Sequence, residues 1–326
     1  MPPVTIRHPT ETLHHAQYPA IDPTNPSNSA AGKTVIISGG ASGIGYAIAQ
    51  AFSTAGAATV IILARRQEAL DEASAKLRAE NEAAKRSTEV WTYLLDIKDS
   101  AASQSLFATI RQRISSSSGP ATDADILVTS AAYLMQGQSS LEEPEQVYRE
   151  SLDTNLFGNL GLVRAFLAPE IPAIPFSAMT GGVKDISGAK APTQQKVILD
   201  VSSSASYYVL PGQGAYSSSK LAFTRVMQSL QAELDQLENQ PIRVHSFNPG
   251  LIYTEAVSKL FESKTDKFPI PWDDVSLAGG FAVWLASPAA SFLKGKFVMS
   301  TWDVEEMIAQ KDKFEDPDFS VITLKI

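Results

Sequence analysis

The chain has 326 residues, of which 44% are hydrophobic, so it is long enough to bury a full core. Its formal net charge of −8 argues against a nucleic-acid surface, which needs clustered lysine and arginine. The absence of cysteine excludes disulfides and thiolate metal sites, and no apolar run is long enough to cross a bilayer. We therefore expect a soluble, cytoplasmic, globular protein that binds neither nucleic acid nor a membrane.

Residues 1–32 are rich in proline, serine, threonine and asparagine and show no sustained periodicity, which predicts an irregular leader. Three of the four histidines lie in this leader. The adjacent His14 and His15 could bind a stray metal ion, but histidines in such a setting are usually solvated. We therefore predict no metal site.

From residue 33 onward, short apolar runs that predict strands alternate with helical patterns. Strands are predicted over 34–38, 58–64, 90–96, 125–130, 197–202, 242–248 and 296–300, and helices over 43–56, 68–85, 99–114, 143–168, 215–237 and 274–286. Near-continuous apolar strands that alternate with helices are typical of a parallel sheet covered on both faces. The sequence therefore predicts a doubly wound α/β domain over 33–300, followed by a tail over 301–326.

Two stretches of this domain do not fit a regular element. Residues 169–195 are rich in proline and glycine and are interpreted as an insertion. Residues 256–272 form a mixed loop with aromatic side chains, which is a candidate lid for a substrate.

The stretch SGGASGIG, residues 38–45, follows the first strand and opens the first helix. Gly39 permits a tight turn, Gly43 lets the backbone approach a pyrophosphate, and Gly45 lets the helix pack closely on the sheet. Exposed N–H groups at the helix start, in the turn that also holds Ser42 and Ile44, favour a phosphate. A plain turn is the alternative, but this position in the fold favours a dinucleotide site.

The second strand ends with the residues ILARR. In dinucleotide folds an acidic residue at this strand end binds the ribose 2′-hydroxyl, whereas arginine accommodates a 2′-phosphate. Ala64 occupies the acidic position and Arg65 follows it, which favours NADP(H) over NAD(H). Alternatively, Arg65 and Arg66 are the solvated start of a helix.

Tyr216 and Lys220 lie four positions apart, on one face of a predicted helix. Ser203 closes the preceding strand, thirteen residues before Tyr216, where ligands bind in open α/β sheets. A neighbouring ammonium group favours the ionised phenol, so Tyr216 can exchange a proton with a carbonyl oxygen that Ser203 holds. Lys220 can also hold the ribose of the nicotinamide.

The motifs SGGASGIG, VSSSA, YSSSK and FNPGLIYT, in this order, resemble the short-chain dehydrogenase/reductase family in its ordinary, non-extended branch. The resemblance covers about residues 33–300 and implies a single Rossmann domain with a seven-stranded parallel sheet. It further implies hydride transfer between NAD(P)(H) and a carbonyl or alcohol, and a homodimer or homotetramer. The stretch WDVEE near the end is similar to reductases of filamentous fungi, many of them tied to secondary metabolism.

By position, the resemblance implies a catalytic set made of Asn155, Ser203, Tyr216 and Lys220. The resemblance also implies contacts to the cofactor. Asp96 would bind the amino group of the adenine, and Thr254 and the backbone of Ile252 would contact the nicotinamide with its carboxamide. The other implied cofactor-binding residues are Ala131, Asn155, Tyr216, Lys220, Pro249 and Gly250.

Each of these assignments has a structural alternative. Asp96 and Thr254 could be helix caps, and Asn155 could be a buried structural amide. Ser202 or Ser204 could replace Ser203, although the spacing to Tyr216 favours Ser203.

The chain also departs from the family pattern in two places. Residues 129–132 read Thr-Ser-Ala-Ala where the family commonly has Asn-Asn-Ala-Gly. We expect this turn to survive without the usual asparagine hydrogen bonds. The last strand continues as FVMSTWDVEEM, where the family often has an Asp-Gly-Gly segment. The family pattern therefore does not predict the C-terminal edge of the substrate pocket in this chain.

The residues expected near the nicotinamide are mainly apolar and aromatic: Ala132, Tyr133, Leu134, Ser206, Tyr207 and Leu210, with Leu260, Phe261, Phe268 and Trp272 from the candidate lid. This lining favours a hydrophobic ketone or secondary alcohol, unless the aromatic side chains merely pack the loop. The sequence therefore predicts a carbonyl reductase or alcohol dehydrogenase. The alternatives are a non-redox isomerase or cyclase on the same fold, and an NADP(H)-sensing regulatory protein.

Overall fold

The computed structural model describes residues 8–116, 123–135, 137–168, 194–237, 240–259 and 271–322. Within these residues, seven strands form one parallel sheet in the order β3-β2-β1-β4-β5-β6-β7. The strands are β1 (Thr34–Ser38), β2 (Thr59–Ala64), β3 (Glu89–Leu94), β4 (Ile126–Thr129), β5 (Lys196–Val201), β6 (Ile242–Asn248) and β7 (Phe297–Met299). The strand order reverses between β1 and β4, which is where open α/β sheets bind ligands.

The central strands are buried on both faces. Every residue of β1, β4 and β5 is buried, and most of them are valine, isoleucine or leucine. Such strands need helices on both sides of the sheet. Asp200, inside β5, is a fully buried charged group among these apolar residues.

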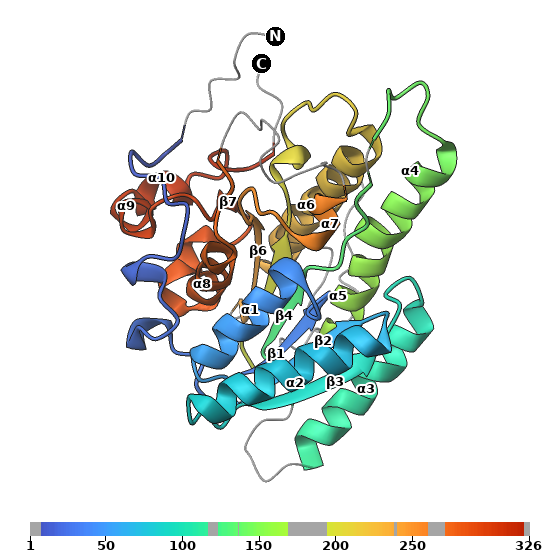
Figure 1. Cartoon of the computed structure of the whole chain (residues 1–326). Coiled ribbons are helices and arrows are strands. Elements are labelled where there is room, and N and C mark those ends of the chain that lie inside the picture. The colour runs from blue at the N-terminus through green and yellow to red at the C-terminus, as the bar shows by residue number, and fades with distance from the viewer. Residues whose placement is uncertain are drawn as a thin grey trace.

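Helices cover the two faces of the sheet (Figure 1). One face carries α1 (Gly43–Thr54), α2 (Gln67–Ala83) and α8 (Val275–Ala286), and the other carries α3 (Ser100–Ser116), α5 (Asn159–Leu167) and α6 (Gly214–Leu234). A separate apolar cluster fills each side, with Phe52 and Phe281 in the first and Phe107 and Phe166 in the second. The predicted doubly wound fold, a single Rossmann-like domain, is confirmed.

The helix predicted over 143–168 is one run with a local irregularity. It begins as α4 (Glu145–Leu152), passes through a π-helical turn, η3 (Asp153–Gly158), and continues as α5. Asn155 lies in this turn and is fully buried. Single π-turns inside helices are frequent at functional sites, because they redirect side chains.

The leader packs on the domain and on the C-terminal segment, with two short helices, η1 (Pro19–Ile21) and η2 (Pro26–Asn28). The C-terminal segment holds α9 (Val304–Ala309) and α10 (Lys311–Glu315). An antiparallel bridge joins Leu13 to Trp302, and the carboxylate of Glu306 accepts hydrogen bonds from the N–H groups of Glu11 and Thr12.

The prediction of solvated leader histidines holds only in part, because the side chain of His15 is 53% exposed but both His14 and His15 contact carboxylates. His14 Nε2 lies 2.8 Å from Asp303 Oδ2, and His15 Nδ1 lies 2.5 Å from Asp273 Oδ1. Both imidazoles therefore have carboxylate partners that are distant in the sequence, which the composition of the leader did not reveal.

The remaining short elements lie near the ends of β5, β6 and α8. They are η4 (Ser204–Ser206), α7 (Glu255–Ser258) and η5 (Pro288–Leu293). Most of the predicted insertion (169–193) and of the predicted lid (260–270) lies outside the described residues, so the division into leader, domain, insertion, lid and tail stays a prediction. Over the part of the chain that is described, no helix combines the length and apolarity needed to span a membrane.

Candidate active site

The glycine turn joins β1 to α1 at the carboxyl end of the sheet. Gly43 has a φ of +53°, a conformation that favours glycine, and a Cβ there would lie 3.2 Å from Thr254 Cγ2. A Cβ on Gly39 would lie 2.9 Å from Ala131 Cα, and one on Gly45 would collide with the Gly39 carbonyl. The backbone is therefore packed tightly between α1 and the turn after β4.

The start of α1 fits a phosphate group. Ser42 is the N-cap residue, and its side chain accepts no hydrogen bond from the first helical turn. The first N–H groups of a helix lack internal partners, and the helix dipole makes that end positive. A glycine turn with an uncapped helix of twelve residues behind it suits the pyrophosphate of a dinucleotide.

Ser38 holds the turn after β4. Its Oγ accepts hydrogen bonds from the N–H groups of Ser130 and Ala131, at 3.1 Å each. Asn159 Nδ2 donates to the Ala131 carbonyl at 3.2 Å. The turn survives as predicted, with Ser38 and Asn159 in supporting roles that sequence reasoning missed. The sequence did carry one signal for the role of Ser38: it is a serine at the end of β1, whose other residues are valine, isoleucine and threonine.

The serines after β5 have different surroundings. Ser202 is buried, and its Oγ lies 2.5 Å from Thr224 Oγ1 of α6. Ser203 is half-buried, and its Oγ accepts a hydrogen bond from Ala205 N at 3.2 Å, which leaves its own proton available to a ligand. Asn248 of β6 supports this turn, because its Oδ1 accepts from Ser204 N at 3.1 Å. These contacts favour Ser203 over Ser202 as the residue that faces a ligand.

Lys220 is buried against the end of β5. Its Nζ donates to the Val201 carbonyl at 2.8 Å, and its side chain lies in a polar cluster under the sheet end. Asp200 belongs to this cluster, with Oδ2 accepting from Thr224 Oγ1 at 3.1 Å. Burial raises the pKa of Asp200, and the positive charge of Lys220 opposes that rise. A buried ammonium group thus lies one helical turn beyond Tyr216.

Asn155 connects the π-turn to the start of α6. Its Oδ1 accepts from Tyr133 N at 2.7 Å, and its Nδ2 donates to Tyr133 O at 3.0 Å and to Ser219 Oγ at 2.9 Å. Ser219 Oγ in turn donates to the carbonyl of Tyr216 at 2.7 Å. The amide thus links Tyr133 to Ser219 and supports the backbone of Tyr216 through Ser219.

The phenol of Tyr216 is half-buried and forms no hydrogen bond to any residue within the described ranges. The first turns of α6 thus place Tyr216, Ser219 and Lys220 beside the end of β5, with Asn155 behind them. Of the four residues predicted to be catalytic, Lys220 is hydrogen-bonded to β5, and Asn155 is linked to the carbonyl of Tyr216 through Ser219. Within the described ranges, the phenol of Tyr216 is left for a ligand.

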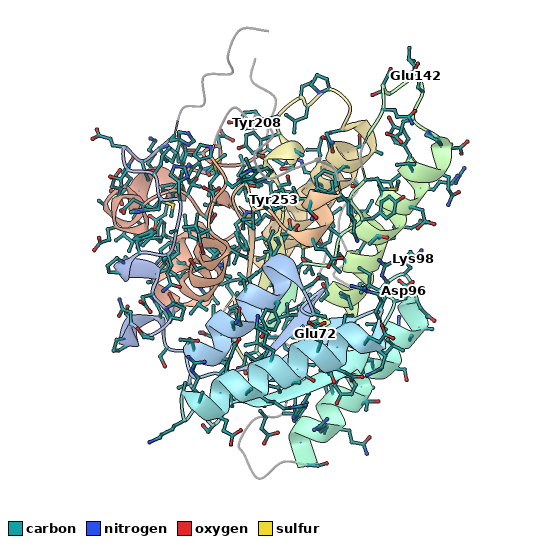
Figure 2. All side chains as sticks on the ribbon, viewed as in Figure 1. Glu72, Asp96, Lys98, Glu142, Tyr208 and Tyr253 are labelled. Carbon is teal, nitrogen blue, oxygen red and sulfur yellow. The ribbon has the colours of Figure 1, made fainter. Side chains whose placement is uncertain are left out.

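The ends of β2 and β3 carry charged, exposed side chains, among them Asp96 and Lys98 (Figure 2). Asp96 Oδ1 accepts from Lys98 N at 3.0 Å, so this carboxylate closes a turn, whereas Asp99 accepts from the first turn of α3. Lys98 Nζ pairs with Glu150 Oε2 at 3.0 Å. The hydrogen bond from Lys98 lowers the pKa of Glu150, with a smaller contribution from the charge of Arg65. Arg65 is thus exposed beside Lys98.

The loop after β6 begins with the buried Pro249 and returns toward the glycine turn. Gly250 has a φ of +99°, and Ile252 is buried and bridged to Asp273. Thr254 Oγ1 accepts from Val257 N at 3.2 Å and therefore caps α7. Its methyl group faces Gly43 at the same time, so the cap and a position beside the predicted cofactor site are compatible.

Aromatic rings gather above the end of the sheet, where Figure 2 labels Tyr208 and Tyr253. The rings of Tyr207 and Tyr208 lie 4.1 Å apart, and those of Tyr253 and Trp272 lie 5.1 Å apart. Ser206 differs from the expectation, because it is buried and its hydroxyl donates to the Ser203 carbonyl at 2.7 Å. The lid residues Leu260, Phe261 and Phe268 lie outside the described residues.

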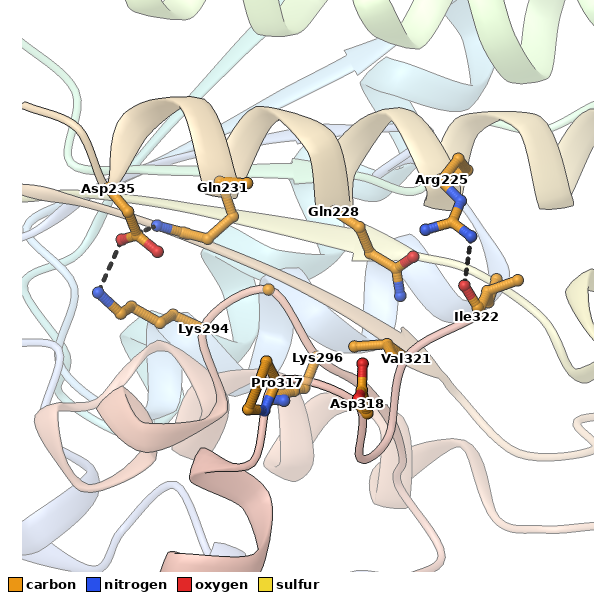
Figure 3. A pocket seen from close by; sticks show the side chains of 12 residues that line it. Arg225, Gln228, Gln231, Asp235, Lys294, Lys296, Pro317, Asp318, Val321 and Ile322 are labelled. Atoms are coloured by element: carbon orange, nitrogen blue, oxygen red, sulfur yellow. Dashed lines mark hydrogen bonds and ion pairs between the residues drawn. The ribbon is translucent and has the colours of Figure 1, made fainter. Parts of the chain in front are cut away.

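A cavity of about 320 Å³ lies elsewhere, between the second half of α6 and the C-terminal segment (Figure 3). Its cationic side chains already have partners: Arg225 donates to Ile322 O, Lys294 pairs with Asp235, and Lys296 donates to the carbonyls of residues 316 and 319. It begins more than two helical turns beyond Tyr216, so we assign it no part in the site.

Comparison with known proteins agrees with this geometry. A family model described as short chain dehydrogenase matches residues 33–265. A short chain dehydrogenase/reductase from Aspergillus novofumigatus is 33% identical over 320 residues, covering 98% of this chain and 97% of that protein. A second, from Aspergillus aculeatus, is 32% identical over 319 residues, with coverage of 98% and 97%. Both come from filamentous fungi, as the WDVEE stretch predicted.

Two solved structures share the fold. A short chain dehydrogenase from Shigella flexneri, complexed with NADP, has a TM-score of 0.65 at 22% identity, covering 84% of this chain and 99% of that one. A 7α-hydroxysteroid dehydrogenase, complexed with NADH and 7-oxo glycochenodeoxycholic acid, has a TM-score of 0.66 at 21% identity, covering 87% and 97%.

Proposed function

Because the chain belongs to the short-chain dehydrogenase/reductase family, we propose that it is an NADP(H)-dependent oxidoreductase acting on a hydrophobic ketone or secondary alcohol. When bound, the nicotinamide coenzyme supplies or accepts the hydride. The observation that carries the proposal is the junction of β5 with α6. There the buried Lys220, the half-buried Ser203 and Tyr216, whose phenol forms no hydrogen bond to a described residue, lie at the carboxyl edge of the sheet.

The protein side of the reaction is a proton transfer. In reduction, Tyr216 Oη gives its proton to the carbonyl oxygen, and in oxidation the ionised phenol takes the proton of the alcohol. Ser203 Oγ holds the same oxygen through the proton that its contact with Ala205 leaves available. The buried ammonium of Lys220 stabilises the negative charge that remains on the phenol.

Lys220 and Asn155 hold this arrangement in place. Val201 takes one of the three ammonium protons of Lys220, so two remain to bind the ribose hydroxyls of the coenzyme. Asn155 and Ser219 fix the carbonyl of Tyr216 and hence the first turn of α6. A relay from Asn155 to Lys220 through water would complete the catalytic set.

The coenzyme would extend along the carboxyl edge of the sheet. The turn of Gly39, Ser42, Gly43, Ile44 and Gly45 would hold the pyrophosphate at the start of α1. The remaining contacts would come from Asp96 at the adenine and from Ala131, Pro249, Gly250, Ile252 and Thr254 near the nicotinamide.

The preference for NADP(H) rests on the charges at the end of β2. Arg65 is exposed, and its positive charge acts on Lys98 and Glu150. The guanidinium of Arg65 would attract a 2′-phosphate, whereas a ribose hydroxyl would gain little from it, and Lys98 is already paired with Glu150.

The substrate class follows from the aromatic rings beside the site. Tyr207 and Tyr208 are neutral at physiological pH, because a phenol has a pKa of about 10, and their rings lie 4.1 Å apart. A neutral aromatic surface binds apolar molecules better than charged keto acids. The fungal relatives favour a role in secondary metabolism, where such carbonyl compounds occur.

Exposed apolar side chains on η3 and α6 favour a homodimer or homotetramer. Phe157 is 60% exposed and Leu221 is 40% exposed, on two elements that contact each other. Pairing this face with a second copy would remove both side chains from water. Sedimentation equilibrium of the full chain would distinguish such an assembly from a monomer.

The proposal is tested by NADPH absorbance with hydrophobic ketones and small charged keto acids, with NADH in parallel. We expect turnover of the hydrophobic ketones with NADPH. Tyr216→Phe should lower kcat by about 10²- to 10⁴-fold and keep NADPH binding, because only the proton donor is removed. Tyr93→Phe is the matched control, because its hydroxyl accepts a hydrogen bond from Arg113 of α3, and this variant should retain activity.

Turnover that survives Tyr216→Phe would remove Tyr216 from the acid role, and turnover of charged keto acids alone would refute the substrate class. If NADPH binds but no ketone is reduced, the proposed oxidoreductase activity is replaced by one of the two alternatives. These are a non-redox isomerase or cyclase, and an NADP(H)-sensing regulatory protein.

A further inference from the structure

Asp273 fixes the backbone of the loop after β6. Its N–H donates to Leu251 O at 2.7 Å, and its Oδ2 accepts from Leu251 N at 2.6 Å. A Cβ on Gly250 would lie 2.6 Å from the same Oδ2, so the carboxylate packs directly on this backbone. The side chain of Asp273 is only 5% exposed. One buried carboxylate therefore determines where Gly250 and Leu251 lie.

The other oxygen of this carboxylate is held by the leader. His15 Nδ1 lies 2.5 Å from Asp273 Oδ1, and the His15 carbonyl accepts from Asp274 N at 2.7 Å. A carboxylate with a donor on each oxygen has little rotational freedom, because turning it would break one of the two bonds. His15 lies outside residues 33–265, which the family model matches, so this contact is an addition to the matched domain.

The same loop reaches the glycine turn. Thr254 N donates to Ile252 O at 3.0 Å, which keeps the loop tight, and Ile252 is bridged to Asp273. Thr254 Cγ2 lies 3.2 Å from the point that a Cβ on Gly43 would occupy. A displacement at Leu251 is therefore passed to Thr254 and to the edge of the glycine turn.

We propose that His15 is a positioning residue for the nicotinamide coenzyme and acts through Asp273 on the loop of residues 250–254. The inference rests on the proposed function, which assigns Gly250, Ile252 and Thr254 to the coenzyme. His15 would act by preorganisation, because a loop that is already fixed loses less conformational entropy when the coenzyme binds.

The neighbouring histidine provides a matched control. His14 Nε2 pairs with Asp303 Oδ2 at 2.8 Å, and its ring stacks on Tyr18 with centroids 3.5 Å apart. His14 thus ties the leader to the C-terminal segment, whereas His15 ties it to the coenzyme loop. Alanine at either position removes one imidazole–carboxylate contact of the same leader.

The test compares His15→Ala and His14→Ala in the full chain, by calorimetric titration with NADPH and by thermal melting. His15→Ala should raise the Kd for NADPH and its KM by about threefold to tenfold with kcat unchanged, since one charge-assisted contact at a partly exposed site is lost. His14→Ala should leave the Kd within about twofold of wild type and lower the melting temperature at least as much.

Equal Kd values of wild type and His15→Ala for NADPH would overturn the inference. An equal loss of NADPH affinity in His15→Ala and His14→Ala would also overturn it, because that result indicates general destabilisation. A wild-type chain that binds neither NADPH nor NADH would instead overturn the proposed function, and the inference with it.

Hydrogen exchange gives a readout without coenzyme. The amide of Leu251 donates to Asp273, so a peptide spanning residues 250–254 should exchange faster in His15→Ala than in wild type or His14→Ala. Unchanged protection of this peptide in His15→Ala would show that His15 does not order the loop, and would overturn the inference.

Discussion

Replacing Ser38 with alanine should destabilise the turn after β4 and weaken coenzyme binding. Ser38 is fully buried at the end of β1, and its Oγ is the acceptor for the N–H groups of both Ser130 and Ala131. Alanine keeps the strand and removes only this oxygen. Both amide groups then lose their acceptor at the point where the turn packs on Gly39.

The size of the effect follows from the exposure of these two amides. A buried donor that loses its partner costs about 1–3 kcal/mol. Ser130 and Ala131 are half-buried, so water can partly replace Ser38, and the lower value applies to each. The sum is about 2 kcal/mol, which corresponds to about 3 °C in melting temperature for a chain of this length.

The assay is thermal melting together with NADPH titration, with Ser53→Ala as the matched control. Ser53 is equally buried, but its Oγ makes a single bond, to Asn81 Oδ1 at 2.6 Å, between α1 and α2. The control should lower the melting temperature and leave the Kd unchanged, whereas Ser38→Ala should affect both. A wild-type melting temperature in Ser38→Ala would refute the role of Ser38, and an unchanged Kd would separate this turn from coenzyme binding.

Two further predictions concern charge. Arg65→Asp should weaken NADPH binding and relatively favour NADH, as measured by titration with both coenzymes. Arg66→Asp is the control and should change the preference less, because the charge of Arg66 acts on Glu255. An unchanged coenzyme preference in Arg65→Asp would contradict the assignment of Arg65. Burial, with a smaller contribution from Arg243, lowers the pKa of His245 to about 3, so the unfolded chain takes up a proton near pH 6.5 that the folded chain refuses. As the pH is lowered from 6.5 to 3, the free energy of unfolding should therefore fall by up to about 1.4 kcal/mol per pH unit. Urea titrations should show a weaker pH dependence in His245→Asn than in wild type. The same pH dependence in both proteins would exclude His245 as the cause.

Most of the fold was predictable because the strands are buried on both faces. A strand such as β2 must then be apolar almost throughout, and the helices between the strands show the period of one buried face. The helix over 143–168 was predicted without its π-turn, because one inserted residue barely alters that period.

The candidate site was only partly predictable. Its motifs are local: the glycine turn, Ser203 at a strand end, and Tyr216 with Lys220 on one helix. The sequence favoured Ser203 over Ser202 only through its spacing to Tyr216, and the contact of the Ser202 hydroxyl with Thr224 adds a structural reason. Whether these residues perform the proposed chemistry stays a prediction.

The amino-acid sequence alone determined the order of strands and helices and the motifs at their ends, because both depend on residues that are close together in the chain. Only the tertiary structure decided that Ser38 supports the turn at Ala131 and that His15 reaches Asp273. These partners are separated by long stretches of chain, and no local pattern encodes a hydrogen bond that exists only once the sheet has formed and the leader has packed against it.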